Sequence, residues 1–338
     1  MKIHILYNFQ NKPWGGGNQF LKALKNELER QGLYEAEPGK ADIILFNSHH
    51  NSNEVFAAKK KYNGKVFIHR IDGPLYLTRG SNKELDKIIY AFNGLVADGT
   101  IFQSQWCREK NKESFGVATR YEAVIHNAPD GNIFNRQKKD FNPAKVRLVA
   151  SSWSSNARKG FEVYKYLDDH LDFSKYEMTF VGNSPLAFNN ITCIKPVHSK
   201  QLAEILQGHD MYITASQNDP CSNSLIEALS CGLPAVALRD GGHPELVLGG
   251  GELFSSTQDL IEKIEKVAHN YFGYQSRITS PSIQIVARRY YEFARHIYHE
   301  VANNSYVPKR ADIRATLRFY TIKLMMVRAQ ITQKLFGL

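Results

Sequence analysis

Short apolar runs of strand length alternate with segments of helical periodicity along most of this chain. Strands that alternate with helices predict βαβ units, in which helices cover a parallel sheet. A chain of 338 residues is long for one hydrophobic core, and its 43% hydrophobic and 22% charged residues exclude a disordered protein. We therefore expect an α/β protein with two domains.

The alternation forms two sets. The first has predicted strands at Lys2–Tyr7, Ala41–Asn47, Lys65–His69 and Gly94–Ala97, short apolar runs at Ile101–Ser104 and Ala123–Ile125, and predicted helices at Asn18–Gln31 and Asn82–Phe92. The second has predicted strands at Val146–Ser151, Met178–Val181, Met211–Thr214 and Ala235–Leu238, and predicted helices at Gly160–Leu171, Lys200–Leu206 and Ser222–Ser230. The polar stretch Asn135–Pro143 separates the sets and is the predicted linker.

These boundaries predict two Rossmann-like domains, residues 1–140 and 141–280, which we expect to face each other across a cleft. Ligands of such sheets bind outside the carboxyl ends of the strands. Residues 281–300 continue as an amphipathic helix rich in Tyr and Arg, which we expect to pack back towards the first domain. Residues 301–338 form a basic tail.

The positive charge is concentrated in this tail. The whole chain has 43 Lys and Arg against 33 Asp and Glu, a net charge of +10, and residues 301–338 contribute seven basic residues and one Asp. An anionic partner is therefore expected at the tail rather than at the two domains, unless the charge serves solubility alone.

A helical tail would have one apolar stripe, formed by Ile313, Leu317, Tyr320, Leu324, Val327, Ile331 and Leu335. Arg310, Arg314 and Arg318 would form a ladder beside it. This pattern predicts that residues 309–338 lie in the interface of an anionic membrane. The alternative is that the stripe packs on the protein's own core or on a second subunit.

The most informative segment is Asp210–Val247. A predicted strand ends there at Thr214, and a polar loop with Asp219 and Ser222 leads into a helix that carries Glu227. The backbone N–H groups of Asn223, Ser224 and Leu225 would face an anion at the start of that helix. Glu227, one turn further on, can accept hydrogen bonds from ribose hydroxyls. The alternative is that Ser222 only caps the helix and Glu227 lies on a solvated face.

Further candidate residues follow the other predicted strands. Arg158 and Lys159 precede the first helix of the second set, and such cations suit a pyrophosphate whose charge grows in the transition state, although a charged surface would look the same. A glycine loop that includes Gly16 and Gly17 follows the first strand, and His69 ends the third. These features have structural alternatives, since glycines also form ordinary turns and a lone His at a strand end is commonly structural.

The segment from Asp219 to Glu245 resembles the nucleotide-sugar glycosyltransferases of the GT-B fold, most closely the retaining family 4 group. The matching residues are Asp219, Glu227, Ala228, Cys231, Gly232, Pro234, Gly241, Gly242 and Glu245. The chain departs from the family's pattern where Asp219 stands for the usual Glu, Ser222 for a Gly and Trp153 for an Arg. Ala128 and Pro129 likewise stand for a Gly and a Val. The resemblance covers about residues 1–300, and the tail lies outside it.

The resemblance implies a role for each candidate. Domain 1–140 would bind the acceptor, with Asn18, Arg70 and Asp72 on that side, and domain 141–280 would bind the donor. Asp219, Lys159 and His69 would act on the transferred sugar and its leaving group. The donor-binding set would be Gly16, Gly17, Arg158, Lys159, Gly182, Asn183, Asp219, Ser222, Asn223, Ser224, Leu225 and Glu227, with the amides of Ser224 and Leu225 on phosphate.

We therefore predict a retaining glycosyltransferase that moves a sugar from a nucleoside diphosphate to a glycan or lipid-linked acceptor in surface polysaccharide or glycoconjugate synthesis. The sequence has no Asp-x-Asp pair to hold a divalent cation, so no metal and no cofactor are expected. The four scattered cysteines predict a reducing, cytoplasmic location, with the protein peripheral on the cytoplasmic membrane face if the tail binds it. A sugar-nucleotide epimerase of the same fold is the alternative. A nucleic-acid-binding protein is disfavoured, since no recognition motif occurs.

Overall fold

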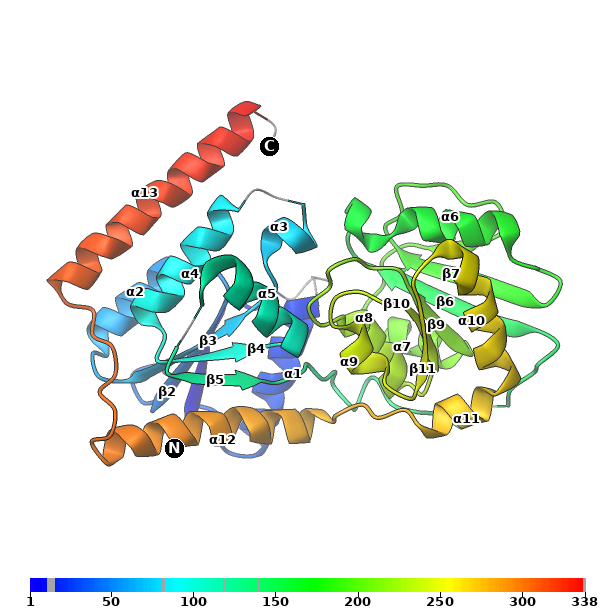
Figure 1. Cartoon of the computed structure of the whole chain (residues 1–338). Coiled ribbons are helices and arrows are strands. Elements are labelled where there is room, and N and C mark those ends of the chain that lie inside the picture. Colours follow the sequence, from blue (N-terminus) through cyan, green and yellow to red (C-terminus); the bar gives the residue numbers. More distant parts are fainter. Residues whose placement is uncertain (11–15, 81–82, 118, 139, 337–338) are drawn as a thin grey trace. The chain divides into compact units, whose positions relative to one another are not determined.

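The chain forms two compact α/β units in the computed structural model, which describes residues 1–10, 16–80, 83–117, 119–138 and 140–336 (Figure 1). Unit 1 comprises Met1–Phe9, Leu24–His126 and Gln284–Leu338, and unit 2 comprises Gln10–Ala23 and Asn127–Ile283. Each unit contains one parallel sheet. The two-sheet α/β class predicted from the alternating pattern is thus confirmed.

Unit 1 is built on a five-stranded parallel sheet in the order β1-β2-β3-β4-β5. Its strands are β1 (Ile3–Leu6), β2 (Ile43–Asn47), β3 (Val66–Ile71), β4 (Gly99–Phe102) and β5 (Tyr121–Val124). Its connecting helices are α1 (Gly16–Arg30, whose first residues group with unit 2), α2 (Ser52–Lys61), α3 (Leu75–Thr78), α4 (Glu84–Val96) and α5 (Gln105–Phe115). A bridge from Ile3 to Tyr34 lies on the other side of β1, so the chain changes direction across the sheet at that strand.

Unit 2 is built on a six-stranded parallel sheet in the order β11-β10-β9-β6-β7-β8. The strands are β6 (Val146–Ser152), β7 (Tyr176–Gly182), β8 (Thr192–Ile194), β9 (Met211–Thr214), β10 (Ala235–Leu238) and β11 (Gly251–Phe254). The helical elements are η1 (Ala157–Lys159), α6 (Phe161–His170), α7 (Ser199–Gln207), α8 (Asn223–Ser230), α9 (His243–Val247), α10 (Thr257–His269) and α11 (Tyr271–Ser276). Two apolar clusters form its core. The strand order reverses between β6 and β9, and such reversal points are where sheets of this kind bind ligands.

One predicted strand is wrong. Residues 94–97 end helix α4 and its cap, and the strand begins at Gly99. The apolar residues Ile88, Phe92 and Val96 recur every four positions and are buried, so the helical period continues through the segment. The run at 94–97 is too short to distinguish a buried helix end from a strand.

Two helices follow unit 2 in the sequence. Helix α12 (Ile283–Ala302) lies along unit 1, where Gly99 leaves room for Ile297 and Phe293, and Arg289 donates a hydrogen bond to Val124 O at 2.8 Å. Helix α13 (Ile313–Phe336) also belongs to unit 1 and packs against α4 (Figure 1). Among the described residues, no helix is long and apolar enough to cross a membrane.

Asp98 binds the segment between α12 and α13 to the rest of unit 1. Its buried carboxylate accepts hydrogen bonds from Lys59 Nζ at 2.9 Å and from the Phe67 amide at 2.8 Å. Its second oxygen accepts from Tyr306 Oη and from the Lys309 amide, each at 2.8 Å. One side chain therefore links α2, β3 and the segment that leads into α13.

We expect Asp98→Ala to lower the free energy of unfolding by about 3–5 kcal/mol, because it leaves the Lys59 ammonium buried without its counter-charge. Denaturant titration would measure the loss. The matched control is Asp42→Ala, because Asp42 accepts a hydrogen bond from the Lys2 amide at a more exposed site. A change no larger than that of the control would contradict the assignment.

Candidate functional site

Four loops of unit 2 leave the carboxyl ends of neighbouring strands. They follow β10, β9, β6 and β7, which are adjacent in the sheet order. The predicted donor-side residues lie on three of them: Arg158 and Lys159 after β6, Gly182 and Asn183 after β7, and Asp219 to Glu227 after β9. The fold therefore gathers at one sheet edge residues that are up to about 70 positions apart in the sequence.

An ion pair joins two of these loops. Lys159 Nζ lies 3.0 Å from Asp219 Oδ2, and both side chains are partly exposed. Burial opposes ionisation of Asp219, but the charge of Lys159 and its hydrogen bond outweigh that effect and hold the pKa of Asp219 below its usual value. The site therefore contains a fixed carboxylate beside a cation that can also interact with an anion.

Two glycines let the loops approach this closely. Gly160, with φ of 74°, follows Lys159, and a Cβ there would lie 2.3 Å from Ala215 O. Gly241, with φ of 61°, has the same role beside Asp219, where a Cβ would lie 2.4 Å from the carbonyl oxygen. The Gly242 amide donates to that oxygen at 2.8 Å. The loops after β6, β9 and β10 thus pack backbone against backbone.

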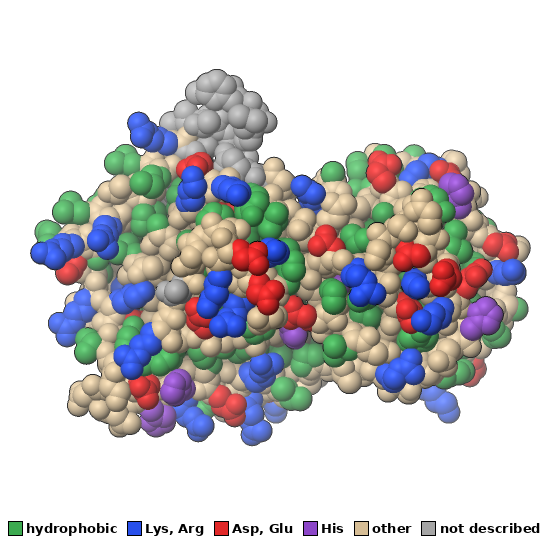
Figure 2. Space-filling view, in the orientation of Figure 1, with side chains coloured by type: hydrophobic (Ala, Val, Ile, Leu, Met, Phe, Trp, Pro, Cys, Tyr) green, Lys and Arg blue, Asp and Glu red, His purple; other side chains and the backbone are tan. Residues whose placement is uncertain are grey.

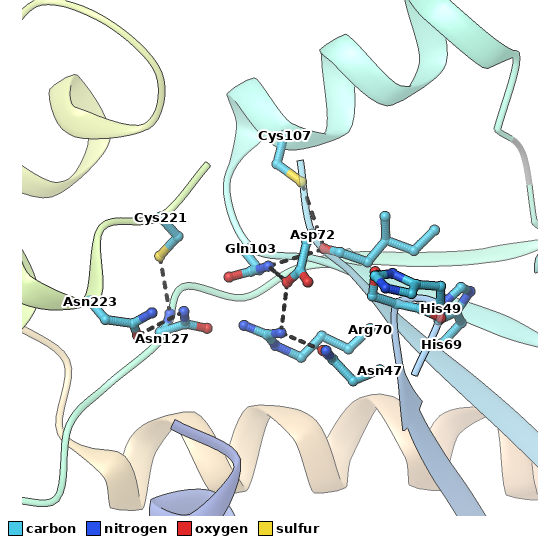
Figure 3. Close-up of polar contacts among 12 residues, drawn as sticks. Asn47, His49, His69, Arg70, Asp72, Gln103, Cys107, Asn127, Cys221 and Asn223 are labelled. Carbon is cyan, nitrogen blue, oxygen red and sulfur yellow. Dashed lines mark hydrogen bonds and ion pairs between the residues drawn. The ribbon is translucent and has the colours of Figure 1, made fainter. Parts of the chain in front are cut away.

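The start of α8 is capped by Ser222, as the sequence allowed. Ser222 Oγ accepts a long hydrogen bond from the Leu225 amide at 3.5 Å and lies 3.2 Å from Ser224 Oγ. The Leu225 amide, which the resemblance assigned to phosphate, is thus engaged by the cap. The Asn223 side chain accepts a hydrogen bond from Asn127 Nδ2 at 3.1 Å (Figure 3). A phosphate at this helix start would compete with the cap for the Leu225 amide.

Glu227 lies one turn into α8, in a partly buried position between buried neighbours. Burial raises the pKa of Glu227 to about 8. The unliganded protein therefore keeps a carboxylic acid here near neutral pH, in a place where a hydrogen-bonding ligand would favour the carboxylate.

The remaining donor-side residues lie around the ends of β6 and β7. Gly182, with φ of 135°, passes so close to Ser152 that a Cβ would lie 1.9 Å from its carbonyl oxygen. Asn183 donates from its amide to Ser152 O and from its side chain to Trp153 O, at 3.0 and 2.8 Å. Arg158 Nη1 donates a hydrogen bond to Gln217 Oε1 at 3.1 Å. Trp153, at the position where the resemblance expects an Arg, is 44% exposed.

In unit 1, His69 is a buried residue whose two ring nitrogens are both engaged. Its Nε2 lies 2.8 Å from Ser48 O, its Nδ1 lies 3.1 Å from Asn93 Nδ2, and the ring stacks on Phe46. Burial lowers the pKa of His69 to about 3. This geometry favours the structural alternative, since neither nitrogen is left for a substrate.

Arg70 and Asp72 form a network at the carboxyl edge of the unit 1 sheet. Asp72 Oδ1 lies 3.1 Å from Arg70 Nη1 and also accepts a hydrogen bond from Gln103, while Arg70 donates to Asn47 Oδ1 at 2.5 Å (Figure 3). Arg70 is fully buried, whereas the Asp72 side chain is 32% exposed. Asp72 is thus the member of this pair that a ligand can reach.

The predicted glycine loop lies partly outside the described residues, which exclude Gly15. Gly16 and Gly17 begin helix α1, and a Cβ at Gly16 would lie 2.4 Å from Asn223 Nδ2, within unit 2. Asn18 is buried and uses its side chain on the backbone of Gln10, with bonds of 2.9 and 3.1 Å. The Asn18 side chain is therefore engaged by the backbone of Gln10.

Sequence reasoning missed His243, which follows the two glycines after β10. Its Nδ1 lies 2.9 Å from Leu238 O, so this nitrogen carries the proton and Nε2 is an acceptor. Nε2 is buried and has no hydrogen-bond partner among the described residues. Burial lowers the pKa of His243, although the charge of Asp219 opposes the shift. The available signal was the position of His243 directly after Gly241 and Gly242.

Comparison with known proteins identifies the fold of this chain. Residues 165–270 match a family model described as "Glycosyl transferases group 1". HepE from Anabaena, solved with UDP-glucose, superposes with a TM-score of 0.61 at 15% identity over 90% of this chain and 99% of that one. Sucrose-phosphate synthase from Thermosynechococcus elongatus superposes with a TM-score of 0.64 at 13% identity over the whole of both chains. The chain has the GT-B fold.

One curated protein is also similar to this chain in sequence. A probable sucrose-phosphate synthase from Thermosipho melanesiensis is 24% identical over 152 residues, which is 43% of this GT-B chain and 34% of the relative. The match thus spans about a third of that protein's length. The group 1 segment contains β9, Asp219, α8 and Glu227, so it coincides with most of the site described above.

We expect Glu227→Gln to stabilise the unliganded protein at pH 8 and to leave it unchanged at pH 4. The unfolded chain releases the Glu227 proton near pH 4.5 and the folded protein near pH 8, so ionisation costs stability as the pH rises between these values. After allowance for partial exposure, the gain at pH 8 is about 2 kcal/mol, or about 4–8 °C in Tm. Thermal unfolding at both pH values measures it. Equal Tm values of the variant and the unmodified protein at pH 8 would contradict the raised pKa of Glu227.

Proposed function

We propose that this GT-B protein is a glycosyltransferase that moves a sugar from a nucleoside diphosphate to an acceptor hydroxyl. The observation that carries the proposal is the Lys159–Asp219 ion pair beside the start of α8, at the sheet edge where the group 1 segment lies. A cation and a helix start suit a diphosphate, and a carboxylate suits sugar hydroxyls. The alternative of an epimerase shares this donor chemistry and differs in needing no acceptor.

The positive and negative groups of the site would bind different parts of the donor. Lys159 and the first turn of α8 would stabilise the negative charge that grows on the departing diphosphate. Asp219 would accept hydrogen bonds from hydroxyls of the transferred sugar, and Glu227 from the ribose. Asp219 thus passes from its contact with Lys159 to the sugar as Lys159 turns to phosphate.

We further propose that transfer retains the anomeric configuration, as the sequence resemblance implies. The acceptor oxygen then forms its bond to the anomeric carbon on the face from which the diphosphate leaves, and the acceptor proton passes to the departing phosphate oxygen. Uridine diphosphate sugars are the first donors to test, because the HepE structure contains UDP-glucose.

The acceptor we propose is a glycan or a lipid-linked glycan, consistent with synthesis of a surface polysaccharide or glycoconjugate. Asp72, partly exposed at the edge of the unit 1 sheet, is the proposed acceptor-side carboxylate. The proposed location is the cytoplasm, with the protein peripheral on the inner face of the membrane. The exposed apolar face of α13 supports a site of action at a membrane surface.

We expect Lys159→Ala to reduce kcat/KM for sugar transfer by about 10²–10³-fold, equivalent to about 3–4 kcal/mol of lost transition-state stabilisation. The donor is first chosen by thermal shift among UDP, GDP, ADP and dTDP sugars, because a bound ligand raises Tm. Lys175→Ala, at a 69% exposed side chain away from these loops, is the matched control and should leave kcat/KM unchanged.

Near-normal turnover of a folded Lys159→Ala protein would contradict the proposed function. Donor hydrolysis or isomerisation that no acceptor increases would instead favour the epimerase. A full screen in which no sugar nucleotide shifts Tm would count against both enzymes.

We expect transfer to continue in excess EDTA, because Lys159 and the start of α8 supply the positive charge that a divalent cation supplies in other transferases. Initial rates with and without EDTA, after removal of bound metals, measure the effect. Complete loss of activity that Mg²⁺ or Mn²⁺ alone restores would contradict this expectation.

A further inference from the structure

Helix α13 has apolar residues on two opposite sides. Ala315, Phe319 and Ile322 are buried against unit 1. Phe319 stacks on Phe56 of α2 with ring centroids 4.0 Å apart and also contacts Phe92 of α4. This side, rather than the stripe that the sequence emphasised, holds the helix to the protein.

The stripe faces outwards. Ile313, Leu317, Tyr320 and Leu324 are 77%, 65%, 60% and 67% exposed, and Val327 continues the row at 50%. These residues recur every three or four positions, so at about 100° per residue they form one row along the helix. The side chains of Ile331 and Leu335 lie outside the described residues. The alternative that the stripe packs on the protein's own core is therefore wrong for its described part.

Cations flank this stripe. Arg314, Arg318 and Arg328 are exposed on one flank of α13, and Lys323 lies on the other flank. Arg310, which precedes the helix, is also exposed. The sequence from Lys309 to Leu338 contains one acidic residue, Asp312, which accepts a hydrogen bond from the Ala315 amide at 2.8 Å at the helix start. Figure 2 shows hydrophobic and basic side chains together over this part of unit 1.

The helix is held in a fixed orientation. Tyr306 Oη and the Lys309 amide both donate to Asp98, and Lys309 Nζ donates to Gly94 O at 2.8 Å. Because Phe319 packs on the opposite side, the stripe is exposed to solvent while α13 remains packed on unit 1. A large apolar row left in water on a fixed helix indicates a surface that something else covers.

We propose that the outward face of α13 binds an anionic phospholipid bilayer, with its apolar row in the headgroup–acyl boundary and its arginines on the lipid phosphates. An apolar row with basic edges is the pattern of a helix that lies in the interface. A second copy of the chain fits less well. In a symmetric dimer the arginine ladders of both copies would share one interface, and the sequence of α13 contains no acidic residue to pair with them, since Asp312 precedes the helix. The proposal is independent of the enzymatic activity.

The test is flotation of the full chain with vesicles of phosphatidylcholine alone or with one-third phosphatidylglycerol. We expect flotation with the anionic vesicles at low salt and much less with the neutral ones. Leu317→Ser/Leu324→Ser should weaken binding by about tenfold or more through lost apolar burial. Arg314→Gln/Arg318→Gln should weaken it at low salt and reduce its salt dependence.

Matched controls come from α12. Ile285→Ser removes an exposed apolar side chain there, and Arg288→Gln/Arg295→Gln removes two exposed charges, so neither should alter binding. Unchanged thermal unfolding confirms that each variant is folded. Full-chain protein that stays soluble with anionic vesicles would overturn the proposal, as would flotation that the α13 variants do not weaken. A dimer that Leu317→Ser/Leu324→Ser converts to a monomer would overturn it in favour of a second copy.

Discussion

The pairing of β6 with β9 is the constraint on which the site in unit 2 depends. Leu148 pairs with Met211 and Val149 with Tyr212, although β7 and β8 lie between the two strands in the sequence. Because parallel strands end at the same edge, this pairing brings the loop with Lys159 to the loop with Asp219. The ion pair and the glycine contacts at Gly160 and Gly241 then fix the spacing between these loops.

Unsatisfied and perturbed groups gather at that edge. Glu227 is held towards its neutral form by burial, and the buried Nε2 of His243 has no hydrogen-bond partner among the described residues. Asp219 stays ionised because Lys159 compensates for its burial. Such a combination costs stability, and proteins retain it where a ligand completes the hydrogen bonds. In unit 1, by contrast, both ring nitrogens of His69 have hydrogen-bond partners within the unit.

The tail adds a second surface of different character. Its packed side, formed by Ala315, Phe319 and Ile322, joins the core of unit 1, whereas its outward side combines exposed apolar side chains with arginines. Asp98 links the core of unit 1 to the tail, because the carboxylate that neutralises Lys59 also accepts hydrogen bonds from Tyr306 and Lys309. A catalytic site that acts on lipid-linked glycans would gain from such a surface by being held near its acceptor.

The sequence by itself determined the fold class, most strands and the donor-side segment, because those depend on local periodicity and on residues close together in the chain. The strands Met211–Thr214 and Ala235–Leu238 have the predicted bounds. Tertiary structure decided what depends on distant neighbours. It placed residues 94–97 in a helix end, engaged both nitrogens of His69, and used the Leu225 amide in a cap. It also chose which side of α13 packs inward. Periodicity shows that Ile313 and Leu317 share a face, but Phe56 and Phe92, more than 200 residues away, select Phe319 for burial.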